Sequence, residues 1–395
     1  MKVLHVIPAV AACYGGPSRA VLDTCRTLRK EGIEAEIATT NADGNVNLPI
    51  PEDAPTLVDG VPVHFFERQR PWDYKFSWGL TRWLKRNVAG YDLLHLHAVF
   101  SYSTAVAAFY ARKHAIPYIM LPHGMLTPWP VRQNWLLKQV YLKMIERRNL
   151  EGAAAVQFTA EEELRTSVVR GRFNFVLPCI VDLETNGNRL RPKPDPTRLR
   201  ILFLSRIDPK KGIDLLIAAL SSLAEEGLDF ELILAGAGEQ KYEERVKAMI
   251  HEAGLSARTK VTGFVDRLTK AELFETSDIF VLPSHQENFG TAIVEAMTFG
   301  LPVIISNRVD IQAEIAKAGA GLIVSPAIEE LCAAIRTLSN DPLLRCEMGQ
   351  RAMDLAQRRF CGAANAGETL RVYRDIIQDS RESSAWKSLP KPLAV

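Results

Sequence analysis

Short apolar runs alternate with longer amphipathic segments along almost the whole chain. In the first half, polar residues, glycine or proline bound each run, and the segments between the runs have helical periodicity. Apolar runs separated by helices are typical of parallel strands that are covered on both faces. The strands expected in the first half are Val3–Ile7, Ala35–Thr39, Val63–Phe66, Leu93–His97, Tyr118–Leu121, Ala155–Phe158 and Phe173–Leu177.

Three prolines, at positions 192, 194 and 196, interrupt this alternation and indicate a linker. The alternation then resumes, with strands expected at Ile201–Ser205, Glu231–Ala235, Lys260–Thr262, Ile279–Pro283, Val303–Ser306 and Gly321–Val324, and helices at Ile213–Glu225, Gln240–Glu252, Lys270–Thr276 and Thr291–Thr298. From Glu329 to about Gln378 the pattern is wholly helical, and Glu382–Val395 is expected to be a tail. The chain is therefore predicted to be an α/β protein with two doubly wound, Rossmann-like domains that face each other across a cleft. We expect one domain at 1–185, completed by a C-terminal helix at about 362–395, and the other at 198–361.

Composition and charge narrow the class of protein. The chain has 395 residues, a net charge of +2, and six cysteines with neither C-x-x-C nor zinc-ligand spacing. These values favour a reduced, cytoplasmic enzyme and argue against nucleic acid as a partner and against a metal site. No apolar run approaches the length of a membrane span. The apolar stretch after Lys2 is expected to be a buried first strand, and a short lipoprotein signal ending at Cys13 is the alternative.

The loop after the first strand of the second half reads Ser205-Arg206-Ile207-Asp208-Pro209-Lys210-Lys211-Gly212. Arg206 can bind phosphate oxygens with its planar guanidinium group, and Lys211 adds a second positive charge. The helix expected after Gly212 directs the positive end of its dipole at the same loop. The pattern indicates an anion site, and a solvated basic loop is the alternative.

A second loop, after the expected strand Ile279–Pro283, contains Glu287 and opens a helix at Gly290-Thr291 that carries Glu295. Two carboxylates at this spacing can accept hydrogen bonds from two hydroxyl-rich parts of one ligand, while the helix N-terminus between them favours phosphate. A ligand that contains sugar, phosphate and ribose in series fits this layout. An ordinary helix start with acidic residues nearby is the alternative.

In the first half, Gly15-Gly16 follows the opening strand and His123-Gly124 follows the strand Tyr118–Leu121. Two glycines let the backbone approach a ligand closely, although a tight turn also requires glycine. His123 is suited to hydrogen-bond a sugar hydroxyl or a reacting carbonyl, and a structural role is the alternative. His95 and His97 are expected to be buried or at a strand tip and are weaker candidates.

Taken together, these loops resemble the retaining GT-B glycosyltransferases of glycosyltransferase family 4, and the resemblance covers nearly the whole chain. Its most specific element is the pair Glu287 and Glu295, which stands in an E-x7-E arrangement within an E-N-F-G-T context. The loop 205–212 looks like the family's G-R-x-x-x-x-K-G loop with serine in place of the first glycine. Gly15-Gly16 and His123-Gly124 match the family's N-terminal glycine loop and its His-Gly pair.

The resemblance implies a role for each matched residue. Arg206 and Lys211 would neutralise the diphosphate of a nucleotide-sugar donor and stabilise the leaving group without a metal or other cofactor. Glu287 would hold hydroxyls of the donor sugar and Glu295 the ribose, while His123 would lie near the sugar and the reacting bond. Donor contacts are also implied for Gly15, Gly16, Ser205, Asn288 and the backbone of Phe264, Val265, Phe289, Gly290 and Thr291. The first domain would bind the acceptor and the second the donor.

The sequence indicates the substrates less clearly than it indicates the loops that bind the donor. The resemblance favours transfer of a hexose from a UDP sugar, because UDP is the commonest nucleotide in the family, to a saccharide or lipid-linked saccharide; ADP and GDP remain alternatives. In Trp135–Arg148, apolar residues alternate with basic ones, which indicates peripheral contact with the inner face of a membrane, and a solvated helix face is the alternative for the basic residues. Other classes that fit are a non-transferase GT-B relative, such as an epimerase or a phosphorylase, and a sugar-binding protein without chemistry.

Two further expectations concern single positions. The family commonly has an Asn-Gly-Val-Asp segment after the first half's last strand, whereas this chain reads Cys179-Ile180-Val181-Asp182. The loss of Asn-Gly removes support for an acceptor or hinge role there. Lys211 is expected to be an exposed lysine whose loss affects turnover far more than stability.

Overall fold

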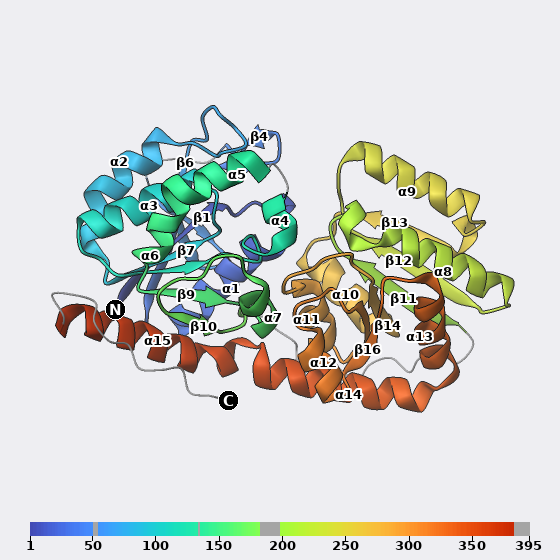
Figure 1. Ribbon diagram of the computed structural model, residues 1–395. Helices are drawn as coiled ribbons and strands as arrows, with labels where there is room; N and C mark the ends of the chain where they lie inside the picture. The colour runs from blue at the N-terminus through green and yellow to red at the C-terminus, as the bar shows by residue number, and fades with distance from the viewer. Residues whose placement is uncertain (50–53, 133–134, 182–197, 383–395) are drawn as a thin grey trace. The chain divides into compact units, whose positions relative to one another are not determined.

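The computed structural model describes residues 1–49, 54–132, 135–181 and 198–382. The chain divides into two compact units, one made of Met1–Asp182 with Cys361–Val395 and the other of Leu183–Phe360 (Figure 1). The three linker prolines and the expected tail beyond Glu382 lie outside the described residues.

The first unit is built on an eight-stranded sheet with the order β10-β9-β8-β7-β1-β2-β6-β5. All neighbouring strands are parallel except β5 and β6. Three of the predicted strands, β7, β8 and β9, have the expected bounds. The sequence missed β5 and the small β3–β4 hairpin, because a strand of two or three residues leaves no periodic signal. The strands are β1 (Lys2–Ala9), β2 (Glu34–Thr40), β3 (Ala42–Asp43), β4 (Val46–Asn47), β5 (Thr56–Val58), β6 (Val61–Phe66), β7 (Leu93–His97), β8 (Tyr118–Leu121), β9 (Ala155–Phe158) and β10 (Asn174–Val176).

Helices cover both faces of this sheet and enclose two apolar cores. On one face, α1 and α15 pack against the strands through buried residues that include Leu28 and Tyr373. On the other face, α2 and α3 do so through residues such as Leu84 and Ala108. The helix α15 therefore belongs to the first unit although it ends the described chain. The helices are α1 (Gly16–Lys30), α2 (Trp78–Asn87), α3 (Tyr102–Lys113), α4 (Pro128–Arg132), α5 (Trp135–Tyr141), α6 (Arg147–Glu151), α7 (Glu161–Thr166) and α15 (Gly362–Glu382), and a π-helix spans Leu142–Glu146.

The second unit has a six-stranded sheet with the order β13-β12-β11-β14-β15-β16, and all its neighbours are parallel. This is the doubly wound Rossmann order, in which the direction of winding reverses between β11 and β14. The strands are β11 (Leu199–Leu204), β12 (Phe230–Ala235), β13 (Thr259–Gly263), β14 (Ile279–Leu282), β15 (Val303–Ser306) and β16 (Gly321–Val324). The helices are α8 (Ile213–Glu225), α9 (Gln240–Glu252), α10 (Arg267–Thr276), α11 (Thr291–Thr298), α12 (Gln312–Ala318), α13 (Ile328–Asn340) and α14 (Pro342–Arg359).

The C-terminal stretch that was expected to be wholly helical is divided into three helices, α13, α14 and α15. Asp341 ends the first and caps the second, because its side chain accepts a hydrogen bond from the Leu344 N–H at 2.9 Å. Pro342 fits the first turn of α14, where no backbone donor is needed. The break between α14 and α15 coincides with the boundary between the two units.

Candidate functional site

In the second unit, the loops after β11 and β14 lie at the point where the winding reverses, which is where ligands bind in open α/β sheets. The two loops are locked together, since the His285 N–H donates to the Lys210 carbonyl at 2.8 Å. Gly212 has a left-handed φ of 68°, and a Cβ atom at this position would lie 2.2 Å from the Pro283 carbonyl oxygen. Glycine is therefore required at position 212 to let the loops meet.

An ion pair between Lys211 and Glu287 also joins these two loops. The Lys211 ammonium group forms an ion pair with the Glu287 carboxylate, and their side chains are only 12% and 16% exposed. Glu287 is held in turn by its backbone, which donates to the Arg308 carbonyl at 3.0 Å and accepts from the Asp310 N–H at 3.1 Å. The expectation of an exposed Lys211 is therefore wrong, because removal of this lysine would leave a largely buried carboxylate without its counter-charge.

Arg206 differs from Lys211 in that its side chain is 53% exposed. Its guanidinium group lies 3.9 Å from the Asp208 carboxylate, beyond hydrogen-bond distance. Asp208 is itself engaged with the loop, where its side chain accepts a hydrogen bond from the Lys210 N–H at 2.9 Å. The donors of Arg206 thus reach solvent, next to a loop that holds further positive charge, and suit an anionic ligand.

The helix α11 begins at the same edge of the sheet. Gly290 caps it with a left-handed φ of 66°, so the first backbone N–H groups of α11 are directed out of the helix. Phe289 anchors this turn, because its buried ring packs edge-on against Phe360 at a centroid distance of 5.6 Å. Asn288 accepts a backbone hydrogen bond from Asp310 at 3.2 Å. The turn is therefore rigid and offers backbone donors.

Glu295 lies one to two turns inside α11 and is buried. Its carboxylate forms an ion pair with Lys270 of the neighbouring helix α10. The sequence analysis missed Lys270, because nothing in the local pattern links it to a residue 25 positions away. The E-x7-E arrangement thus carries a lysine on each carboxylate, Lys211 on the first and Lys270 on the second.

Phe264 and Val265 follow β13 at the same edge of the sheet. The Phe264 ring is exposed, although a large aromatic side chain is usually packed. Asp266 then starts α10 by accepting a hydrogen bond from the Thr269 N–H at 2.8 Å. This short segment presents an exposed aromatic ring at the carboxyl end of β13.

In the first unit, the two matched motifs lie at the ends of β1 and β8. Gly15 caps α1 with φ 75° and ψ −140°, a conformation that glycine adopts readily, and α1 begins at Gly16. His123 and Gly124 both have positive φ, of 53° and 76°. This is uncommon for a residue with a side chain and marks a constrained turn.

A buried carboxylate holds the His123-Gly124 turn in place. Glu163 of α7 accepts a hydrogen bond from the Gly124 N–H at 2.5 Å through one oxygen. Its other oxygen accepts from the backbone N–H and the hydroxyl of Thr159, both at 2.7 Å. The sequence analysis overlooked Glu163, whose only local signal was its place in the first turn of a short acidic helix.

The sequence also matches two known family models. Residues 15–174 match the family model described as a glycosyl transferase 4-like domain, and residues 188–354 match the model described as glycosyl transferases group 1. The two matches follow one another along the chain in the order of the two units. The chain belongs to the family 4 glycosyltransferases with the GT-B fold.

Curated relatives match this glycosyltransferase over nearly its whole length. It is 26% identical to D-inositol 3-phosphate glycosyltransferase from Corynebacterium glutamicum (strain R), with 92% of each chain covered. It is 25% identical to GDP-mannose:cellobiosyl-diphosphopolyprenol alpha-mannosyltransferase from Komagataeibacter xylinus, with 95% of this chain and 94% of that protein covered.

Solved structures share the fold. Sucrose-phosphate synthase from Thermosynechococcus elongatus superposes with a TM-score of 0.75 at 20% identity, over 96% of this chain and 99% of its own. Anabaena Alr3699/HepE in complex with UDP and glucose superposes with a TM-score of 0.72 at 20% identity, over 95% and 99% of the two chains.

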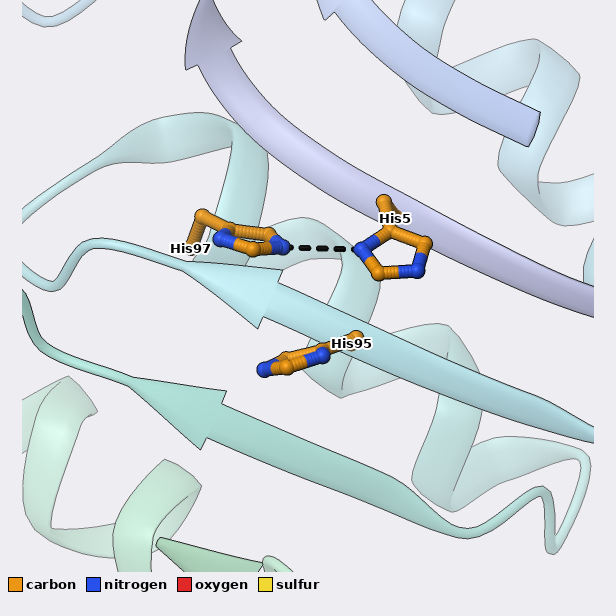
Figure 2. A group of neighbouring side chains, drawn as sticks. All are labelled: His5, His95 and His97. Atoms are coloured by element: carbon orange, nitrogen blue, oxygen red, sulfur yellow. Dashed lines mark hydrogen bonds between the residues drawn. The ribbon is translucent and has the colours of Figure 1, made fainter. Parts of the chain in front are cut away.

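This glycosyltransferase also contains three buried histidines on adjacent strands, His5 of β1 and His95 and His97 of β7 (Figure 2). Figure 2 shows the three rings close together, with His97 hydrogen-bonded to His5. One nitrogen of each ring lies within 4.8 Å of the others, which is close enough for the three to share a metal ion. However, the His5 Nδ1 to His97 Nε2 distance of 2.9 Å is that of a hydrogen bond, with a proton between the two rings. His95 bonds separately to the Tyr373 hydroxyl at 2.6 Å.

The segment after β10 is buried where the structure describes it. Cys179, Ile180 and Val181 are all buried, and Asp182 lies outside the described residues. Cys179 lines a small cavity of about 20 Å³ together with His95, His97 and His123, all within the first unit. Such a volume holds about one water molecule, so the cavity is too small for a sugar.

Proposed function

We propose that this glycosyltransferase moves a hexose from a nucleoside-diphosphate sugar, with UDP favoured, to a saccharide or lipid-linked saccharide, and that the anomeric configuration is retained. The observation that carries the proposal is the arrangement after β11 and β14. There, exposed Arg206, paired Lys211 and the open N-terminus of α11 gather at one edge of the second unit's sheet. Guanidinium, ammonium and free backbone N–H groups are the donors that bind a diphosphate.

In the proposed reaction, the bond between the anomeric carbon and the diphosphate oxygen breaks while the acceptor oxygen bonds to the same face of that carbon. The acceptor's proton passes to the departing diphosphate oxygen, so no carboxylate nucleophile is needed. Arg206 and Lys211 stabilise the negative charge that develops on the diphosphate, which makes a metal unnecessary in this scheme.

The remaining residues are assigned to parts of the donor. Glu287, fixed by Lys211, would accept hydrogen bonds from sugar hydroxyls, and Glu295, fixed by Lys270, would accept them from the ribose. The family resemblance further assigns the base to the backbone of Phe264 and Val265, and donor contacts to Gly15, Gly16, His123, Ser205, Asn288, Phe289, Gly290 and Thr291.

Isothermal titration of the full chain with UDP, GDP and ADP, each with and without EDTA, tests the donor site. We expect one diphosphate to bind equally well with EDTA. GDP is the main alternative nucleotide, since the name of the Komagataeibacter xylinus relative includes GDP-mannose. Loss of the charge-assisted bonds in Arg206→Ala should weaken binding by about tenfold to a hundredfold.

The matched control is Arg336→Ala, which removes another half-exposed arginine of the same unit, paired with Glu226 on its surface. This control should bind as the wild type does. Binding that needs a divalent metal, or equal loss in both variants, would contradict the assignment of Arg206 to the diphosphate.

We further propose that the acceptor is met at a membrane surface. The surface concerned, the α5 patch, consists of Trp135, Leu136, Leu137, Val140 and Met144, whose exposed fractions run from 54% to 74%. Lys143, Arg147 and Arg148 are exposed beside it. Tyr141, in the same segment, is partly buried and its hydroxyl is hydrogen-bonded to the Tyr74 hydroxyl, so it is not part of the patch. Aromatic and aliphatic side chains flanked by basic ones bind anionic membrane surfaces. None of the described helices is long and apolar enough to cross the bilayer.

Co-sedimentation with anionic and with neutral vesicles at low and high salt tests the α5 patch. We expect binding to anionic vesicles that salt weakens and that Leu136→Ser with Leu137→Ser abolishes. Leu343→Ser, which changes an equally exposed leucine on α14, is the matched control and should bind normally. Equal sedimentation of both variants, or none of the wild type, would refute membrane docking.

A further inference from the structure

Three histidine rings form a continuous hydrogen-bonded chain through the first unit, from the core to the constrained turn. His5 Nδ1 lies 2.9 Å from His97 Nε2, and His97 Nδ1 lies 3.2 Å from His123 Nε2. These residues come from β1, β7 and the loop after β8, which are consecutive in the sheet. The winding of this sheet reverses between β1 and β7, so the chain of rings runs through the position where such sheets bind ligands.

The rings lie edge to edge. Their centroids are 5.2 Å and 5.4 Å apart and their planes differ by only 28° and 22°. These separations exceed the nitrogen–nitrogen distances by about two ring radii, so the nitrogens point at one another nearly within a common plane. This is the geometry of direct imidazole–imidazole hydrogen bonds.

All three rings are neutral at physiological pH. Desolvation lowers the pKa of His5 to about 3 and that of His123 to about 4, and burial holds the pKa of His97 well below its ordinary value. A neutral imidazole carries one N–H and one lone pair. Each link of the chain needs one of each, so all the N–H groups must point in the same direction along it.

The end at His5 decides which direction is adopted. Among the described residues, His5 Nε2 is buried without a hydrogen-bond partner. If the protons pointed towards His5, this nitrogen would be a buried N–H donor without an acceptor, which native proteins rarely tolerate. If they point towards His123, the same nitrogen holds only an unused lone pair. At the other end, Cys179 Sγ lies 4.0 Å from His123 Nδ1 and can serve weakly as donor or acceptor, so it favours neither direction.

We infer that His5 and His97 fix His123 as the Nδ1–H tautomer, so that His123 offers a hydrogen-bond donor to its ligand and does not act as a base. The inference rests on the proposed function in one respect, namely that His123 contacts the sugar donor. His97 and His5 are then positioning residues, since they act through His123. The donor would be directed at an oxygen of the sugar or of the departing diphosphate.

Nitrogen-15 NMR of histidine-labelled wild-type protein tests the tautomers directly, without any need for turnover. We expect His5, His97 and His123 all to be neutral Nδ1–H tautomers at pH 7, although free histidine favours Nε2–H. An Nε2–H tautomer at His123 would overturn the inference even if the enzyme is fully active. If no nucleotide sugar is turned over, the proposed function fails while the tautomers can still be read.

Two substitutions at one position test the positioning role. Asparagine carries its amide nitrogen near the place of Nδ1, so His97→Asn keeps a donor to His123, whereas His97→Leu has similar bulk and no donor. We expect His123 to remain the Nδ1–H tautomer in His97→Asn and to become a mixture of tautomers in His97→Leu. We also expect the kcat of His97→Leu to be at least tenfold lower than that of His97→Asn. An unchanged His123 tautomer in His97→Leu would refute the coupling. Hydrogen exchange of the β1 and β7 amides, which belong to the same unit as the histidines, is the folding control.

His5→Leu extends the test to a residue that does not contact His123. We expect this substitution also to alter the proportion of the His123 tautomers, because it removes the donor at the start of the chain. If the His123 signals are the same as in the wild type, His5 does not influence the His123 tautomer, and His97 is the only residue left in the positioning role.

Discussion

Removal of Lys211 should affect both folding and catalysis, and a second substitution should separate the two effects. An exposed ion pair contributes about 0–1 kcal/mol, whereas loss of one partner of a buried pair costs about 3–5 kcal/mol. Lys211 and Glu287 are 12% and 16% exposed, which places them nearer the buried limit. We therefore expect Lys211→Met to destabilise the second unit by about 2–3 kcal/mol.

Hydrogen exchange of the β11 and β14 amides, followed by mass spectrometry, reports the opening of the second unit separately from the first. Exchange in Lys211→Met should be about 30- to 150-fold faster than in the wild type, since each 1.4 kcal/mol is a factor of ten. In Lys211→Met with Glu287→Gln no unpaired carboxylate remains, so stability should return to within about 1 kcal/mol of the wild type.

Turnover should behave differently from stability. Loss of one cation that stabilises a leaving group typically lowers the rate about 10²- to 10³-fold. The double variant should be at least as slow as Lys211→Met, because Glu287→Gln also weakens the proposed contact with the sugar hydroxyls. Normal exchange in Lys211→Met would show that the buried pair does not form. Recovery of turnover in the double variant would remove Lys211 from the reaction.

Three further substitutions have defined outcomes. Burial raises the pKa of Glu146 to about 7, so the folded state binds this proton more tightly than the unfolded state and the free energy of unfolding falls as pH rises from about 4.5 to 7. Urea unfolding at several pH values should show that Glu146→Gln removes up to about 3 kcal/mol of this fall, and an unchanged pH dependence would contradict the prediction. Gly212→Ala should disrupt the loop 205–212 and abolish nucleotide binding in the titration, because the added Cβ would lie 2.2 Å from a carbonyl oxygen. Gly227 also has a positive φ, but an added Cβ there would have nothing within 4 Å, so Gly227→Ala should bind normally. Lys270→Met leaves the buried Glu295 carboxylate unpaired and should lower the melting temperature, and adding Glu295→Gln to this variant should restore most of the lost melting temperature. If the two substitutions lower the melting temperature additively, the ion pair between Lys270 and Glu295 is ruled out.

The fold was largely predictable because buried parallel strands are short apolar runs with polar ends. The strands β7, β8, β9, β15 and β16 and the helices α8, α9 and α11 have the bounds that the pattern predicted. The C-terminal stretch is helical as predicted, but its division at Asp341-Pro342 was not predicted although the signal was present, since an aspartate followed by proline is a common helix start. Helical periodicity alone cannot register such a break, because it continues on both sides.

The loops of the candidate site were predictable, but their pairing was not. Glycine and charged residues after strands are local signals, so the loops that hold Lys211 and Glu287 stood out in the sequence. Whether a lysine is exposed or paired depends on a partner 76 positions away. The histidine chain depends on the register in which β1 pairs with β7, where His5 lies opposite His95, and on the left-handed turn at His123. Neither feature leaves a periodic trace.

The most direct test of the central claim is the configuration of the sugar released from its donor. Proton NMR can follow the slow hydrolysis of α-linked UDP-glucose and GDP-mannose by the full chain in EDTA, where water replaces the acceptor. Retention without a metal predicts that the α-anomer of the sugar appears first, before it equilibrates in solution, and that Arg206→Ala slows its release. Initial appearance of the β-anomer, or release only after a divalent metal is added, would contradict the account.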